Sequence, residues 1–184
     1  MKTLKIKLIN IDNPYSYEKS SYYDLWGTIQ LHYENETLLD TQWNIFEFIE
    51  WFNKCDNKLS NEIFPFRYYN SIAESRNILF SKDDFTNNTE EDKYYYKLGE
   101  YFQCHCFKLK GTNTPIFYIG FGCDFIGEIS YEREKQFFKY TFDMKRFITD
   151  TDLQIKEFVA KLFLDEKRLS YFKETIPKYF SHLK

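Results

Sequence analysis

Aromatic residues dominate the bulky apolar side chains of this chain, and this feature limits how its core can be built. Among 184 residues there are 20 Phe and 16 Tyr, whereas Ala occurs only at positions 73 and 160 and Val only at position 159. Each buried ring removes about 150–250 Å² from water, and a chain of this length buries roughly 70% of its unfolded surface. We therefore expect a single domain over residues 1–184 whose core is built from large rings.

The spacing of apolar residues predicts strands in neighbouring runs. Residues 2–9 alternate apolar with polar side chains, and residues 25–33 and 37–43 resemble two strands joined by a turn at residues 34–36. Four further strands are predicted over residues 101–109, 116–121, 125–131 and 136–143. Because runs of strands pair more readily with their neighbours, we expect an α+β fold with antiparallel sheets, an N-terminal hairpin and a central meander.

Helices are predicted by apolar stripes and by residues that cap helix ends. A capping box at Asn44 and Glu47 starts one helix, which we expect to end before a linker over residues 56–61. A shorter helix is predicted from Ser71 to Phe80. A second capping box begins at Thr151, and a last helix starts near Asp165, so a helical pair should pack at the C-terminal end.

Charge and hydropathy narrow the classes of protein to consider. The formal net charge is −3 with a sequence pI of about 5.7, so no overall basic field attracts nucleic acid. The first residues lack the pattern of an export signal, and no apolar run approaches the roughly 20 residues that span a bilayer. We expect a soluble cytoplasmic protein with reduced thiols.

The cluster Cys104-His105-Cys106, followed by Cys123, is the most metal-like group in the sequence. Zinc needs about four converging ligands, but in the predicted strand Cys104 and Cys106 share one face while His105 points to the other. We therefore interpret the two cysteines as small apolar core residues and expect no metal or cofactor.

Familiar catalytic patterns are also missing from the sequence. His32 and His182 stand in no recognisable motif, no serine elbow is present, and Gly120-Phe121-Gly122 is not a phosphate-binding loop. The acid pairs Asp124 with Glu128 and Glu132 with Glu134 are interpreted as solvent-facing, because 28 acidic residues make such pairs common. We predict no catalytic residues, although an enzyme without a familiar motif stays an alternative.

Carboxylates and tyrosines instead accumulate in one segment near the middle of the chain. Residues 83–92 hold five acidic and no basic residues and are predicted to form an exposed loop, followed by three consecutive tyrosines. Tyrosine is enriched at protein interfaces, and carboxylates speed the capture of a basic partner. The predicted partner-binding residues are Asp83, Asp84, Glu90, Glu91, Asp92, Tyr94, Tyr95 and Tyr96.

The run from Trp26 to Phe52, with LLDTQWNIFEFIEWF as its most distinctive part, resembles the small immunity proteins that bacteria pair with polymorphic or contact-dependent toxins. The acidic, aromatic and glycine-poor composition agrees with this resemblance. The resemblance implies a cytoplasmic, non-enzymatic inhibitor that binds a cognate toxin domain, often a basic nuclease, and blocks its active site or substrate surface. It carries over no functional residue, because these families share no fixed site.

A nucleic-acid-binding accessory protein is a further alternative to this protein-binding hypothesis. Its basis is a local basic strip beside aromatic residues, at Lys135, Lys139, Lys145 and Arg146. Along the rest of the chain, basic residues are interspersed with acidic residues. We therefore expect the partner to be a protein, with no membrane and no nucleic acid.

Overall fold

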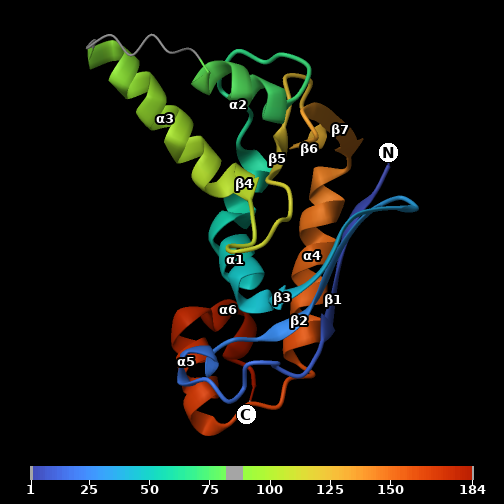
Figure 1. Cartoon of the computed structure of the whole chain (residues 1–184), viewed down its shortest axis with the longest axis vertical. Helices are drawn as coiled ribbons and strands as arrows, with labels where there is room; N and C mark the ends of the chain where they lie inside the picture. The colour runs from blue at the N-terminus through green and yellow to red at the C-terminus, as the bar shows by residue number, and fades with distance from the viewer. Residues whose placement is uncertain (1, 82–88, 184) are drawn as a thin grey trace. The chain divides into compact units, whose positions relative to one another are not determined.

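A computed structural model describes residues 2–81 and 89–183, and its strands form two antiparallel sheets (Figure 1). The first has the order β1-β2-β3, from β1 (Leu4–Asn10), β2 (Trp26–Tyr33) and β3 (Glu36–Asn44). The second has the order β4-β5-β6-β7, from β4 (Cys106–Phe107), β5 (Phe117–Phe121), β6 (Gly127–Arg133) and β7 (Gln136–Phe142). The predicted α+β fold with an N-terminal hairpin and a central meander is confirmed.

Helices occupy most of the remaining described chain. They are α1 (Ile45–Asn61), α2 (Ile72–Phe80), α3 (Thr89–His105), α4 (Met144–Val159), α5 (Glu166–Thr175) and α6 (Pro177–Phe180), with a short 3₁₀ helix at η1 (Lys19–Ser21). Within the described ranges, every helix is too short or too polar to cross a bilayer.

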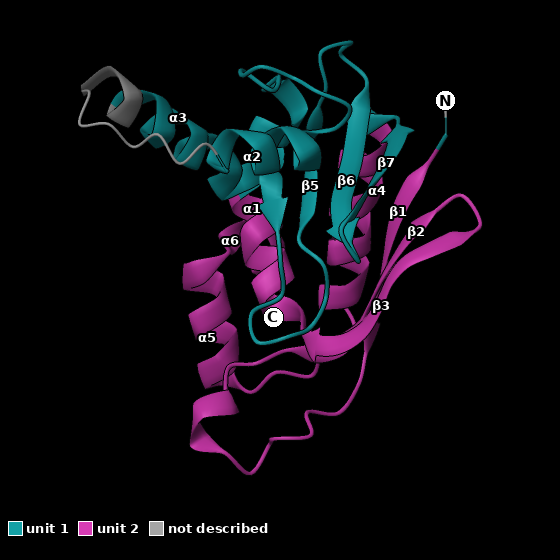
Figure 2. Ribbon diagram, turned by 45° about the horizontal axis from the view of Figure 1, so that its top comes forward, with its two compact units in different colours: residues 1–2, 55–145 teal, residues 3–54, 146–184 magenta. Residues whose placement is uncertain are grey.

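The chain groups into two compact units (Figure 2). Unit 1 comprises residues 1–2 and 55–145 and contains the second sheet, and unit 2 comprises residues 3–54 and 146–184 and contains the first. Residues 55–145 of unit 1 are therefore an insertion into unit 2, and α1 and α4 run through the two crossing points that bound this insertion. The expectation of a single domain stays a prediction.

The core of unit 1 forms where α2 packs on β5 and β6 and α3 packs on β4 and β5. Rings dominate it, as the composition predicts. Its buried members are Phe64, Ile72, Ala73, Leu79, Leu98, Tyr101, Phe102 and Tyr118.

Unit 2 buries one face of its sheet and a set of rings from its helices. Leu4, Ile6 and Leu8 alternate with exposed lysines in β1, as a half-buried strand requires. Phe172 of α5 lies with its ring centroid 5.1 Å from that of Phe46 and 4.9 Å from that of Phe180. The C-terminal helices thus pack through aromatic contacts.

Two predicted helix boundaries are wrong, and buried residues explain both. The predicted linker over residues 56–61 belongs to α1, because Cys55 and Leu59 extend the buried stripe past Phe52. Helix α4 begins at Met144 and not near Thr151, which is fully buried in the helix interior. In both helices the helical spacing of buried residues continues past the boundary that was expected from the sequence.

The predicted strand over residues 101–109 is also wrong, because α3 continues to His105 and only Cys106–Phe107 is extended. Leu98, Tyr101 and Phe102 are buried at helical spacing in the core of unit 1. Cys104 and His105 therefore lie in the last turn of a helix, and the face-sharing argument made for a strand does not apply to them.

Candidate functional site

The three predicted tyrosines lie in the first half of α3 and differ in exposure. Tyr96 is 70% exposed, Tyr94 is 37% exposed and Tyr95 is partly buried. The Tyr94 ring packs edge-on against Phe66, with centroids 5.1 Å apart, and the Tyr95 ring lies 6.3 Å from that of Phe80. These contacts fix two of the three rings, while Tyr96 extends from the opposite side of the helix.

The five predicted carboxylates stand directly before these tyrosines. Asp83 and Asp84 lie outside the described residues, and so do the side chains of Glu90, Glu91 and Asp92. The prediction of a loop through residue 92 is wrong from Thr89 onward, where α3 begins. Acidic residues favour a helix N-terminus because the helix dipole is positive there, so this composition suits a first helical turn as well as a loop.

The outward face of α3 combines one ring with both signs of charge. Lys93, Tyr96, Lys97 and Glu100 are exposed at positions that share one face of the helix. Burial, and then the nearby hydroxyls of Tyr95 and Tyr69, raise the pKa of Tyr94. The phenol therefore stays neutral and available as a hydrogen-bond donor.

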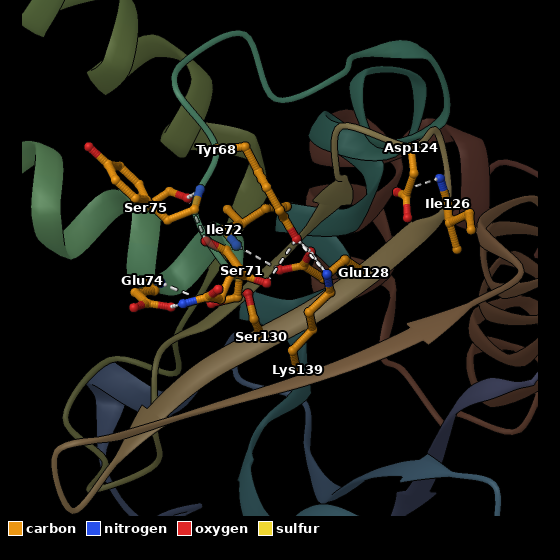
Figure 3. A network of polar contacts seen from close by, with 12 residues as sticks. Tyr68, Ser71, Ile72, Glu74, Ser75, Asp124, Ile126, Glu128, Ser130 and Lys139 are labelled. Atoms are coloured by element: carbon orange, nitrogen blue, oxygen red, sulfur yellow. Dashed lines mark hydrogen bonds and ion pairs between the residues drawn. The ribbon is translucent and has the colours of Figure 1, made fainter.

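A second group of polar residues surrounds Glu128, whose side chain is only 1% exposed (Figure 3). Its Oε1 accepts a hydrogen bond from the backbone N–H of Ile72 at 2.7 Å, and its Oε2 accepts one from the Tyr68 hydroxyl at 2.6 Å. Lys139 Nζ lies 2.6 Å from that hydroxyl and 3.6 Å from Glu128 Oε2. The prediction that Glu128 faces solvent is wrong.

This network closes the N-terminus of α2. Besides the bond from Ile72 to Glu128, the N–H of Ala73 donates to Ser130 Oγ at 3.0 Å and that of Glu74 donates to Ser71 Oγ at 3.1 Å. Burial, and then Glu128, raise the pKa of Tyr68 above its usual range. We conclude that the Glu128 side chain completes the cap of this helix.

His105 is fully buried at the end of α3 and stacks on Tyr101, with ring centroids 3.8 Å apart and an interplanar angle of 4°. Its Nδ1 donates to the Tyr101 carbonyl at 2.9 Å and lies 3.8 Å from Glu62 Oε2. Burial lowers the pKa of His105 to about 4, although hydrogen bonds to backbone carbonyls oppose this shift. At neutral pH the ring is an uncharged core residue, which makes it a poor candidate for a surface base.

The cysteines do not assemble around an ion in the part of the chain that the structure describes. Cys55 and Cys104 are buried, and Cys123 is exposed. Burial raises the pKa of Cys106. Among the described residues, no group of three or more His, Cys, Asp or Glu side chains could hold a metal ion.

The residues brought together by the fold are thus partly different from those predicted. Tyr94 and Tyr96 of α3 stay the exposed candidates, whereas the buried Glu128 network was missed because its partners lie far from it in the sequence. Comparison with protein-family models, with curated proteins and with solved structures finds no match to this chain.

Proposed function

We propose that this chain is a non-enzymatic, protein-binding inhibitor of the immunity type, and that it meets its partner through the first half of α3. The partner is a basic toxin domain, and binding covers the active site or substrate surface of that domain. The observation that carries the proposal is Tyr96, which is 70% exposed on a helix whose start is strongly acidic.

An exposed tyrosine beside carboxylates has the physical properties of a binding surface. A Tyr ring supplies rigid contact area and a hydroxyl at a low cost in conformational entropy, and rings of this kind dominate interface energetics. The acidic residues 83–92 contribute negative charge in the sequence directly before it. Such charge raises the association rate with a basic protein more than it raises the affinity.

Fixed neighbours on α3 favour the same role. Tyr94 is held by Phe66, and the far half of the helix is anchored by Leu98, Tyr101 and Phe102 in the core of unit 1. A surface that is ordered before binding loses less entropy when the complex forms.

The experiment uses the protein encoded immediately upstream, with its toxin domain inactivated by mutation. We expect the full chain to bind this domain, and co-expression to relieve the toxicity of the active form in a bacterial host. Tyr96→Ala should weaken binding by about 30-fold, which corresponds to about 2 kcal/mol for a central interface tyrosine. The matched control is Tyr17→Ala, because Tyr17 is 77% exposed but belongs to unit 2.

Charge is tested separately on the same pair. Replacing the five acids of residues 83–92 with their amides should lower the association rate and its dependence on salt, while the dissociation rate changes little. An affinity that Tyr96→Ala leaves unchanged removes α3 from the interface. Failure to bind or to protect against the upstream protein contradicts the immunity function itself.

A further inference from the structure

A pocket of about 250 Å³ lies in unit 1 between α2 and the second sheet. Its lining residues are distinct from those on the exposed face of α3. Its lining includes Arg76 from α2, Ile116 before β5 and Tyr118 in β5, and Glu132, Glu134 and Phe137 from the β6–β7 hairpin. The pocket is below the roughly 300–1,000 Å³ typical of drug-sized ligands, so it suits a small molecule.

Arg76 is held in place by rings and not by a carboxylate. Its guanidinium carbon lies 4.7 Å from the centroid of Phe80, 5.6 Å from that of Tyr118 and 5.9 Å from that of Phe102. Among the described side chains, none forms an ion pair with it. Stacking leaves the edge N–H groups of a guanidinium free, and their planar arrangement fits a carboxylate.

Two carboxylates line the same pocket as this cation. Glu132 and Glu134 are exposed, and neither has an ion-pair partner within the described ranges. Glu132 lies near the end of β6 and Glu134 in the turn that follows, and both residues line the pocket. The pocket lining therefore carries charges of both signs.

The hairpin that presents Glu134 has a strained backbone. Arg133 pairs with Gln136, which leaves a two-residue turn, and its residues Glu134 and Lys135 have φ angles of 52° and 63°. Gly and Asn favour such left-handed positions, and other residues occupy them at a cost. Strained residues concentrate at functional sites, which supports a binding role for the Glu134 carboxylate.

Neutral and apolar groups complete the lining. Ile116 and Phe137 provide apolar surface. Burial raises the pKa of Tyr118 to about 12, while the nearby Arg76 opposes the shift. The Tyr118 hydroxyl thus stays protonated at neutral pH and can donate a hydrogen bond beside Arg76.

We propose that this pocket binds a small zwitterion that carries a carboxylate and an ammonium group, of which a free amino acid is the simplest example. The carboxylate pairs with Arg76, the ammonium group faces Glu132 and Glu134, and the apolar part covers Ile116 and Phe137. A ligand with both charges can pair with Arg76 and with the two glutamates, whereas a simple anion would be repelled by the glutamates.

The test titrates the purified full chain with free amino acids and with γ-aminobutyrate, and follows binding by calorimetry. We expect at least one compound to bind with a Kd below about 1 mM, which corresponds to about −4 kcal/mol. Its N-acetyl derivative and its carboxamide should each bind about tenfold more weakly or worse, because each lacks one charge.

Variants test the contributions of Arg76 and of the two glutamates separately. Arg76→Gln and the double change Glu132→Gln with Glu134→Gln should each weaken binding by about tenfold or more. The matched control is Arg67→Gln, because Arg67 also stacks on a ring, that of Tyr69 at 5.3 Å, but is not part of the pocket wall. The exposed glutamates can be changed without touching the core, so the test holds even if Arg76→Gln fails to fold.

Three results would overturn the proposal. The first is the absence of binding by every zwitterion tested, and the second is unchanged affinity in the double glutamate variant. The third is equal binding of the N-acetyl derivative, which would reduce the pocket to a site for simple anions. None of these results bears on the binding of a toxin domain to α3, so the two proposals fail independently.

Discussion

His105 shows how a single buried side chain links the stability of this fold to pH. The ring is enclosed between Tyr101 and the Gly120 backbone, where a Cβ added to Gly120 would lie 3.0 Å from His105 Cδ2. The charged groups nearest to it are Glu62, 3.8 Å away at the end of α1, and Lys58, whose positive charge lowers the His105 pKa further. Protonation therefore places a cation in a nearly dry site.

We predict that His105 makes the protein less stable as the pH falls. Its pKa is about 4 in the folded state against an ordinary value of 6.5, so the unfolded state binds more protons between these values. The free energy of unfolding should fall from pH 6.5 to pH 4, by up to roughly 3 kcal/mol from this residue, and change little further below pH 4.

Urea unfolding at several pH values measures this effect. The His105→Phe variant keeps a ring that can stack on Tyr101 but cannot take up the proton, so its stability should decline less over the same window. Other carboxylates titrate in both proteins, and only the difference between the two curves reports His105. Parallel curves would mean that the folded protein binds a proton at His105 as readily as the unfolded chain does.

Residues such as Glu128 and Arg76 mark the limit of what the sequence reveals at this scale. Each is an ordinary charged residue in a chain with 28 acidic and 25 basic ones. Their roles depend on partners distant in sequence, such as Tyr68 and Lys139 around Glu128. The exposed tyrosines of α3 could be predicted because the signal, three rings after an acidic run, is local.

Whole elements were predictable where a local signal agreed with tertiary packing. Helices α2 and α5 start where predicted, and each start has a capping side chain: Ser71 accepts from the Glu74 N–H and Asp165 accepts from the Arg168 N–H. The first hairpin also turns at the predicted place, although Glu36 pairs with Tyr33 and belongs to β3, so the turn comprises only Glu34 and Asn35. In each case a few consecutive residues determine the geometry.

Prediction failed where packing overrode the local signal. The rings near the end of α3 favour a strand by intrinsic propensity, but their burial at helical spacing against Tyr118 and Phe64 stabilises a helix. The start of α4 was missed because Met144 and Phe147 were assigned to the region after a strand, although both are buried at the spacing of Thr151 and Ile155.

At the scale of elements, we predict that Glu128 is necessary for the attachment of α2 to β6. Glu128→Ala leaves the buried Ile72 N–H without its acceptor and removes the bond from the Tyr68 hydroxyl, which keeps only the Asn70 carbonyl as acceptor, so the free energy of unfolding should fall by about 3 kcal/mol. Urea denaturation measures this loss, and hydrogen exchange at the first amides of α2 locates it.

The matched control is Glu74→Ala, which removes a carboxylate that belongs to the first turn of α2 itself. Glu74 is only partly buried and accepts from the Asn70 side chain at 2.7 Å, so its loss should cost less than about 1 kcal/mol. Equal losses in the two variants would show that dipole stabilisation, and not the buried network, accounts for the contribution of Glu128.

At the scale of the whole molecule, the path of the chain determines how the two units can unfold. Beyond the first three residues, the chain passes between them at Lys54 and Cys55 inside α1, and at Lys145 and Arg146 inside α4. Helix formation is cooperative, so a helix that loses the packing of one half is destabilised in the other half as well. Linkers between independent domains are usually exposed loops, and neither crossing point is one.

We therefore predict that the two units unfold in one transition, and the chain contains natural probes to test this. Its three tryptophans, Trp26, Trp43 and Trp51, belong to unit 2, and its four cysteines belong to unit 1. Tryptophan fluorescence and pulsed thiol labelling of the buried Cys104, in a Cys123→Ser background, should give the same urea midpoint. The core variants Phe172→Ala in unit 2 and Leu98→Ala in unit 1 should each shift both probes together. Separate midpoints would contradict the single domain expected from the sequence, because each unit would then be stable without the other.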